Sequence, residues 1–218
     1  MNKFICKYIL NHYEYISFDI FDTLIERDVN RTSDIFMLVG KKVLGEEKAE
    51  EFRELRKRAE CNAREENQSS EITLEHIYKK MNGIYNQSVI ESLKNEEIKT
   101  ELEHCYIKDN IASFYATCIK HKKVLIVSDM YLSADVIHKM LEKCNVKGYE
   151  SLFVSSEYGV NKISGKLFNI VMDKKKIHAS QMIHIGDSIK ADFLGARKVG
   201  IKSILIGRKN RLKRLIHS

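Results

Sequence analysis

The sequence of 218 residues contains no proline, no apolar run long enough to cross a membrane, and no internal repeat or low-complexity linker. A membrane-spanning helix needs roughly 18 or more consecutive apolar residues. Residues 1–10 carry two lysines and lack the apolar core and cleavage site of a signal peptide. We therefore expect a soluble, cytoplasmic protein without a membrane span. The missing proline is a feature of composition and indicates no function.

Cysteine is sparse and follows no ligand or disulfide pattern. The five residues are odd in number, widely scattered, and contain no C-x-x-C spacing: Cys6, Cys61, Cys105, Cys118 and Cys144. This argues against a disulfide framework and against a structural zinc site. We expect reduced thiols in the core or at its boundary.

Acidic side chains are missing from the last eleven residues, which contain five basic ones: Arg208, Lys209, Arg211, Lys213 and Arg214. Much of the net charge of +7 lies in this tail, so the rest of the chain is nearly balanced. For that reason we expect no nucleic-acid partner. Such a tail is either a solvated terminus or an electrostatic contact to an acidic partner, membrane surface or nucleic acid, and the sequence does not choose among them.

Length and composition favour an α/β core that carries an inserted subdomain. A chain of 218 residues, 44% of them apolar, can bury a substantial core and exceeds a minimal single domain. Residues 15–21 have the pattern of a buried strand, and residues 32–121 have a helical pattern without a convincing strand. One helix there is expected to start at Ser70 or Thr73 and to end at Asn82-Gly83.

Strand and helix patterns alternate after residue 121. The expected strands are 123–128, 151–155, 181–185 and 201–206, and the expected helices are 133–143, 165–175 and 189–199. This alternation predicts a Rossmann-like, doubly wound parallel sheet, with an all-helical cap inserted after its first strand.

Polar residues end three of the apolar strands: Asp19, Ser128 and Asp187. Parallel strands present such residues together at the carboxyl edge of the sheet, where these folds bind ligands. A carboxylate there can attack phosphorus and form an aspartyl-phosphate, if a divalent cation such as Mg²⁺ offsets the repulsion between the two anions. Asp19 would be nucleophile and metal ligand, and Asp187 a second ligand.

Three further side chains could bind the phosphoryl group. The Ser128 hydroxyl can donate to a phosphoryl oxygen, and Lys162 or Lys166 can neutralise charge on the nucleophile and the transferred group. Thr23 could add another hydrogen bond from the turn after the first strand.

Taken together, four segments resemble the motifs of the haloacid dehalogenase superfamily. They are Phe18-Asp19-Ile20-Phe21-Asp22-Thr23-Leu24, the strand that ends at Ser128, Lys162 to Phe168, and Gly186-Asp187-Ser188 with Asp192 following. The resemblance implies a Mg²⁺-dependent hydrolase of a small phosphorylated substrate, with a core at 1–26 and 109–218 and a cap at 27–108. It also favours Lys162 over Lys166, which we expect on an exposed helix face. Asp19, Asp187 and the backbone carbonyl of Phe21 would hold the metal, and Asp192 would bind it directly or orient its other ligands.

One residue departs from the family pattern. Phosphatases of the superfamily place a second aspartate, the general acid and base, two residues after the nucleophile, and this chain has Phe21 there. Asp22 follows, but adjacent side chains on a strand point to opposite faces, and a role in stabilising the turn is the simpler reading. Loss of general acid catalysis costs on the order of 100 to 10,000-fold with poor leaving groups.

Phe21 therefore leaves three functions open. The first is a phosphomonoesterase whose acid is Asp22 or a cap residue. The second is a carbon–halogen or carbon–phosphorus hydrolase, since those relatives also lack the second aspartate. The third is a phosphate-binding or scaffold protein with little or no turnover.

Other polar residues have simpler expected roles. Asp129 is expected to cap the helix that follows the second motif or to orient a ligand, and His184 is expected to be a packed or hydrogen-bonded core residue. Five arginines at the start of the insert are expected either to be solvated or to hold a second anionic group of the substrate: Arg27, Arg31, Arg53, Arg56 and Arg58.

Overall fold

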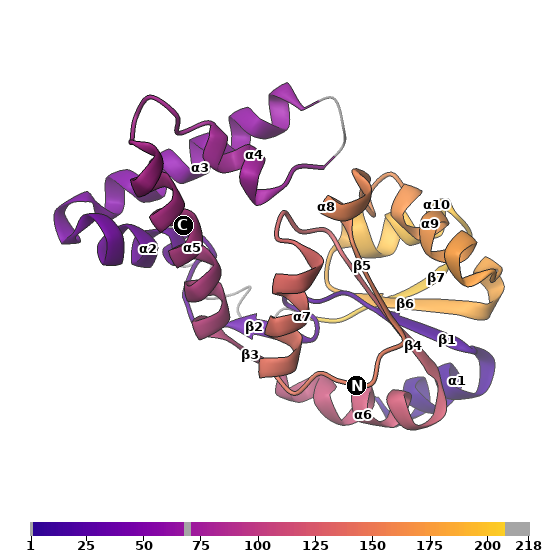
Figure 1. The fold of residues 1–218 in the computed structure, drawn as a ribbon. Helices are drawn as coiled ribbons and strands as arrows, with labels where there is room; N and C mark the ends of the chain where they lie inside the picture. Colours follow the sequence, from indigo (N-terminus) through magenta and orange to yellow (C-terminus); the bar gives the residue numbers. More distant parts are fainter. Residues whose placement is uncertain (1, 68–70, 208–218) are drawn as a thin grey trace.

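The computed structural model describes residues 2–67 and 71–207, which form a sheet-containing core beside a helical cap (Figure 1). The core sheet consists of β1 (Tyr15–Phe18), β4 (Lys123–Ser128), β5 (Ser151–Val154), β6 (Met182–Gly186) and β7 (Lys202–Leu205). All neighbours are parallel, in the order β5-β4-β1-β6-β7. The predicted doubly wound α/β sheet is thereby confirmed.

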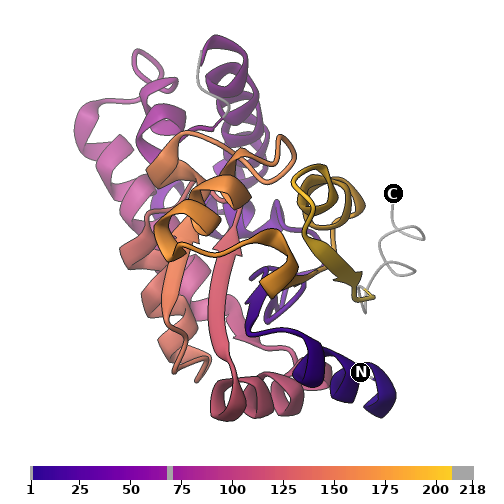
Figure 2. The ribbon, with the colours of Figure 1, turned by 90° about the vertical axis from the view of Figure 1, so that its right-hand side faces the viewer.

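Helices cover both faces of this sheet, as the view turned by 90° shows (Figure 2). One face packs on α1 (Lys3–His12), α6 (Asp109–His121) and α7 (Ala134–Lys143), and the other on α9 (Lys166–Lys175) and α10 (Ala196–Lys198). Side chains of β4 alternate between the two: Val124 and Ile126 join the first cluster, Leu125 and Val127 the second. A strand buried on both faces needs an uninterrupted apolar run, which explains why the sequence revealed it.

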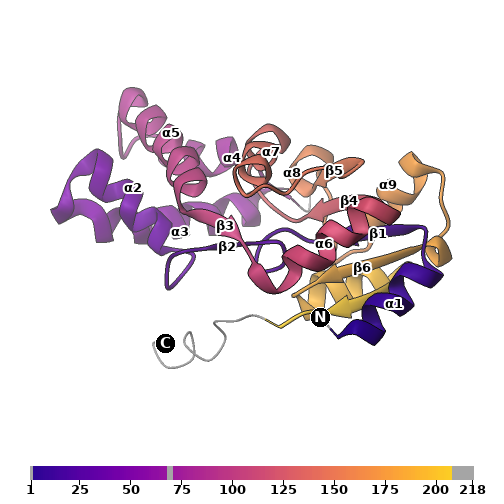
Figure 3. The same ribbon diagram turned by 90° about the horizontal axis from the view of Figure 1, so that it is seen from below.

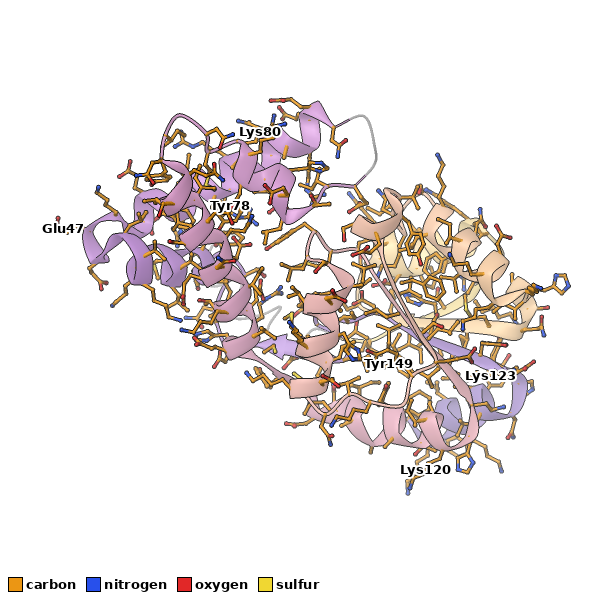
Figure 4. All side chains as sticks on the ribbon, viewed as in Figure 1. Glu47, Tyr78, Lys80, Lys120, Lys123 and Tyr149 are labelled. Carbon is orange, nitrogen blue, oxygen red and sulfur yellow. The ribbon has the colours of Figure 1, made fainter. Side chains whose placement is uncertain are left out.

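The cap is helical between the first two motifs. It contains α2 (Asp34–Leu44), η1 (Glu46–Lys48), α3 (Ala49–Glu66), α4 (Leu74–Lys79) and α5 (Gln87–His104). The predicted start of α4 is confirmed at Thr73, whose side chain accepts a hydrogen bond from the backbone N–H of His76, whereas Ser70 lies outside the described residues. Tyr78 lies inside the cap, and Glu47 and Lys80 lie at its periphery (Figure 4).

A two-stranded ribbon joins the cap to the core, formed by β2 (Ile25–Arg27) and β3 (Cys105–Ile107) (Figure 3). The expectation that residues 32–121 contain no strand is therefore wrong. Each strand has three residues and pairs with a partner about 80 positions away. So short a segment shows no alternation, and pairing between the chain entering and leaving the cap leaves no local signal.

Two other expected elements end early or change type. β1 ends at Phe18 rather than residue 21, because the backbone N–H groups of Thr23, Leu24 and Ile25 all turn back to the Ile20 carbonyl. The expected helix at 189–199 is divided into the wide-turned η3 (Ile189–Gly195) and the short α10. The shorter elements η2 (Ala179–Gln181) and α8 (Ser155–Tyr158) complete the core.

All five cysteines are free thiols. Cys105, Cys118 and Cys144 are buried and Cys6 is partly buried, as expected, but Cys61 is exposed on α3. Its position faces solvent because Ala59 and Ala63 occupy the buried stripe of that helix. No helix among the described residues is long and apolar enough to cross a membrane. The basic tail lies outside the described residues, so its expected partner contact stays a prediction.

Candidate active site

The carboxyl edge of the sheet brings three acidic side chains together. Asp19 follows β1, Asp187 follows β6, and Asp192 belongs to η3. One carboxylate oxygen from each lies within 4.8 Å of the others. Oxygen donors at this separation suit a hard divalent cation such as Mg²⁺.

Lys162 is buried between two of these carboxylates. Its Nζ lies 2.6 Å from Oδ1 of Asp19 and 2.5 Å from Oδ1 of Asp192. Lys166 instead lies exposed on the first turn of α9. The structure thus places Lys162, the first residue of the K-x-x-x-x-x-F segment, beside the expected nucleophile Asp19, and leaves Lys166 in solvent.

Asp129 positions the backbone at Lys162. Both of its carboxylate oxygens accept the backbone N–H of Lys162, at 2.9 and 3.1 Å. The sequence also allowed Asp129 to cap α7. It does not, because Ser133 is the N-cap residue of that helix and its side chain accepts from the backbone N–H of Val136. A carboxylate held by a residue 33 positions away cannot be recognised from local spacing.

Four protein donors surround the carboxylate of Asp192. Oδ1 accepts from Lys162 and lies 3.1 Å from Nε2 of His184, and Oδ2 accepts from the backbone N–H groups of Asp187 and Ser188. Gly186 permits this approach, since a Cβ there would lie 2.2 Å from Cγ of Asp192. The arrangement is that of an orienting residue, which fixes the lysine and the fourth motif in one position.

His184 is a hydrogen-bonded core residue, as the sequence indicated. Its Nδ1 lies 2.8 Å from Oγ of Ser17, and its ring packs against Phe168 at 4.8 Å between centroids. Burial lowers the pKa of the imidazole, so it stays neutral near pH 7. The third and fourth motifs therefore meet behind the site through His184.

Burial and neighbouring charges shift the pKa values of Asp19, Asp192 and Lys162. Burial is the largest influence on the pKa of Asp19 and raises it, Lys162 lowers it, and the neighbouring Asp192 and Asp187 raise it; the outcome is a pKa of about 7. Burial would also raise the pKa of Asp192, but Lys162 and His184 hold it well below its usual range. The pKa of Lys162 is raised because three carboxylates outweigh its desolvation. The ammonium is therefore charged near pH 7, whereas Asp19 is only partly ionised there even beside it.

The expected phosphate donors occupy different positions. Oγ of Ser128 is buried, lines the cleft, and has no hydrogen-bond partner within the described ranges 2–67 and 71–207. Oγ1 of Thr23 is likewise buried without a partner there, but Thr23 does not line the cleft. An unpartnered buried hydroxyl is costly unless a ligand completes it, so the geometry supports Ser128 as a ligand donor and disfavours direct contact by Thr23.

The cleft is a cavity of about 600 Å³ between the core and the cap. Phe21 lines it, and the guanidinium of Arg27 lies over the phenyl ring. Asp22 also lines it, in a left-handed turn with φ +59°, where its backbone N–H donates to the carbonyl of Ile25. Its backbone carbonyl accepts from the buried Lys108. Asp22 thus lies in the turn and lines the cleft, and the expected role of its side chain in stabilising the turn stays a prediction.

The sequence did not reveal several cleft residues. Tyr131 of the core and Thr32, Ser33, Phe36 and Glu60 of the cap line it, and Lys108 supports its floor. Cap residues reach the cleft only through the packing of α2 and α3 over the sheet edge, which no local pattern encodes.

Residues 16–206 match the family model described as haloacid dehalogenase-like hydrolase. The chain belongs to this family. No curated protein matches it in sequence. The family that the order of the four motifs predicted is thereby confirmed.

Solved structures share this fold at low sequence identity. The HAD-hydrolase YfnB from Bacillus subtilis, bound to magnesium, has a TM-score of 0.64 and 16% identity, over 94% of this chain and 98% of that one. A 2-haloacid dehalogenase from Pseudomonas syringae pv. Tomato has 0.64 and 15%, over 94% and 98%. A HAD phosphatase from Thermococcus onnurineus has 0.59 and 15%, over 90% and 87%. The neighbours thus include both a phosphatase and a dehalogenase.

Proposed function

We propose that the protein is a Mg²⁺-dependent phosphomonoesterase that acts on a small phosphorylated metabolite through an aspartyl-phosphate on Asp19. The observation that carries this proposal is the carboxylate cluster. Asp19 is buried beside Asp187 and Asp192, and one buried lysine faces these carboxylates. Because burial raises the pKa of Asp19 to about 7, a divalent cation would favour the ionised nucleophile.

The donor set fits that cation. Asp19, Asp187 and the backbone carbonyl of Phe21 would hold Mg²⁺, while Asp192, with both oxygens already hydrogen-bonded to protein donors, would orient the site. When bound, the metal would neutralise charge as the two anions approach.

The chain's own residues would perform the displacement. A carboxylate oxygen of Asp19 forms the new bond to phosphorus as the ester P–O bond breaks, and the leaving alkoxide takes a proton from water, since Phe21 supplies none. Lys162 and the Ser128 hydroxyl stabilise the phosphoryl oxygens. Water then attacks phosphorus, which releases phosphate and restores Asp19.

A second candidate is the hydrolysis of a carbon–halogen bond, in which Asp19 attacks carbon and displaces halide. It is favoured by Phe21, which supplies no proton, and a halide leaving group needs none. We expect no magnesium requirement for halide displacement. We rank it second because a reaction without a metal leaves the cluster of three carboxylates without a function.

One experiment separates these functions. The purified protein and Asp19→Asn are assayed with p-nitrophenyl phosphate and with 2-chloropropionate, each with Mg²⁺ and with EDTA. Phosphate release that requires both Mg²⁺ and Asp19 supports the proposal. Chloride release in EDTA supports the dehalogenase. No turnover of either by folded protein would leave the non-catalytic, phosphate-binding function.

A further inference from the structure

The cap wall of the cleft carries few groups that could bind an anion. Its lining residues are Arg27 of β2, Thr32, Ser33 and Phe36 at the start of α2, and Glu60 of α3. They face the site of Lys162 and Asp19 across the cavity. The leaving group of any ester bound at Asp19 has to lie against this wall.

The only cation of the cap that lines the cleft, among the residues the structure describes, is already paired. Arg27 donates from Nε and Nη2 to the two carboxylate oxygens of Glu101, at 2.6 and 3.0 Å. The Glu101 side chain is fully buried, so the pair is held in one geometry. The guanidinium of Arg27 also lies over Phe21, 4.1 Å from the centroid of the phenyl ring. The Nε/Nη2 edge of this guanidinium, through which arginine binds a carboxylate or phosphate bidentately, is occupied by Glu101.

Arg56 does not supply the cap wall with another cation for the substrate. It is fully buried and donates from Nε and Nη2 to Glu97, both at 2.8 Å, and from Nη1 to Glu60 at 3.1 Å. The remaining oxygen of Glu60 accepts from Arg64 on the outer side of α3. Both oxygens of Glu60 thus already accept from an arginine, while its side chain stays partly exposed at the cleft.

The cleft as a whole is strongly acidic. Two basic residues line it, Arg27 and Lys162, against six acidic ones: Asp19, Asp22, Glu60, Asp129, Asp187 and Asp192. Of the six, Glu60 is also paired with arginines behind the wall, Arg56 and Arg64. A dianionic phosphoryl group and one divalent cation cancel in formal charge, so a filled site keeps this excess. A second negative charge on the substrate would be repelled by this excess.

The wall instead offers groups for hydroxyls or amines. Ser33 occupies the N-cap position of α2, yet its hydroxyl makes no capping hydrogen bond. Thr32 lies beside it, and Glu60 can accept from O–H or N–H. Phe36 adds an apolar surface to the same wall.

We propose that the cleft selects phosphomonoesters whose leaving group is a neutral polyol or carries an amine, and discriminates against those with a second anionic group, with Glu60 as the specificity-determining residue. The inference rests on the proposed phosphomonoesterase function and assigns its substrate class.

A matched pair of esters tests this inference. Glycerol 3-phosphate and 3-phosphoglycerate are both phosphates of a primary alcohol and differ in one CH₂OH or carboxylate group. Each is measured as a substrate and as a competitive inhibitor of p-nitrophenyl phosphate hydrolysis, so the comparison holds even where turnover is slow. We expect kcat/KM, or the reciprocal inhibition constant, to favour glycerol 3-phosphate roughly tenfold at low salt.

Two variants and one condition locate the effect. Glu60→Gln should lower the preference several-fold by improving binding of 3-phosphoglycerate, while Glu65→Gln, an exposed change on the same helix, should leave it unchanged. Should Glu60→Gln fail to fold, raising the ionic strength of the wild-type assay should narrow the preference in the same direction.

The outcomes are distinguishable from failure of the proposed function. Equal inhibition by the two esters, including none by either, or a preference that Glu60→Gln and salt leave unaltered, overturns this inference while the phosphomonoesterase stands. Absence of Mg²⁺-dependent hydrolysis of p-nitrophenyl phosphate overturns both.

Discussion

The guanidinium of Arg27 lies 4.1 Å from the ring centroid of Phe21, over the side chain that stands two residues after the expected nucleophile. A phenyl ring can neither donate nor accept the proton of a leaving alcohol, and the arginine that covers it stays charged and donates to Glu101. The backbone carbonyl of Phe21 is unaffected by its side chain. The position therefore retains its part in a metal site and loses its part in proton transfer.

We predict a steep dependence of rate on the leaving group. A relative with an acid at this position also hydrolyses p-nitrophenyl phosphate faster than an alkyl phosphate. Without an acid at position 21, we expect the ratio of the two rates in this protein to be about 100 to 10,000 times larger than in such a relative. Phe21→Asp should narrow this ratio, mainly at low pH because Arg27 favours the ionised carboxylate. Phe21→Leu is the control and should keep the ratio. A ratio unchanged by Phe21→Asp would show that another group already protonates the alkoxide.

Replacing the buried lysine should affect both folding and activity. Lys162→Met leaves the buried Asp19 and Asp192 without their ammonium partner, and breaking such a pair costs about 3 to 5 kcal/mol. We expect a loss of this size in urea denaturation, together with loss of phosphatase activity. Lys166→Met, an exposed change four residues away, should stay within about 0.5 kcal/mol. Equal effects of the two changes would contradict the assignment of Lys162 to the site.

Local patterns predicted the core well because its strands are uninterrupted apolar runs that end in polar residues. The strand at Lys123–Ser128 has the predicted bounds, and Asp19, Ser128 and Asp187 meet at one sheet edge. The ribbon of β2 and β3 and the contact of Asp129 with Lys162 were not predictable, because each depends on pairing across many residues. The same holds for Glu60, whose place at the cleft follows from how the cap packs.

Stabilisation by Mg²⁺ should grow with pH. The pKa of Asp19 is raised from 3.8 to about 7 in the folded state, so the metal-free folded protein binds a proton that the unfolded chain lacks between these values. This group's contribution to stability is present at low pH and is lost as pH rises through about 7. Mg²⁺ needs the carboxylate, so it must displace a proton near pH 5.5 but not near pH 8.

Thermal unfolding with and without Mg²⁺ at these two pH values measures the effect. We expect the larger rise in Tm near pH 8, and a small rise at both values in Asp19→Asn. An equal rise at both pH values in the wild type would contradict the role of Asp19 in binding the cation.

The cap has its own buried ion pair, between Arg56 and Glu97, which should stabilise the protein. The Arg56 side chain is fully buried and donates two hydrogen bonds to Glu97, while its guanidinium stacks over the rings of Phe36 and Tyr131. Arg56→Met should destabilise the protein by about 3 kcal/mol or more, because Glu97 is left buried and unpaired. Arg58→Met, exposed on the same helix, should change stability by less than about 0.5 kcal/mol. Chemical denaturation of the two variants makes the comparison, and similar midpoints would contradict it.

The most direct test of the central claim is to trap the covalent intermediate. The protein is mixed with a ³²P-labelled phosphomonoester that it turns over and Mg²⁺, quenched in acid during turnover, digested, and examined by mass spectrometry. We predict one phosphoryl group on the peptide that contains Asp19, labile to hydroxylamine, absent in EDTA and absent in Asp19→Asn. Mg²⁺-dependent turnover with the label on another residue, or with no label in the first turnover, would contradict nucleophilic attack by Asp19.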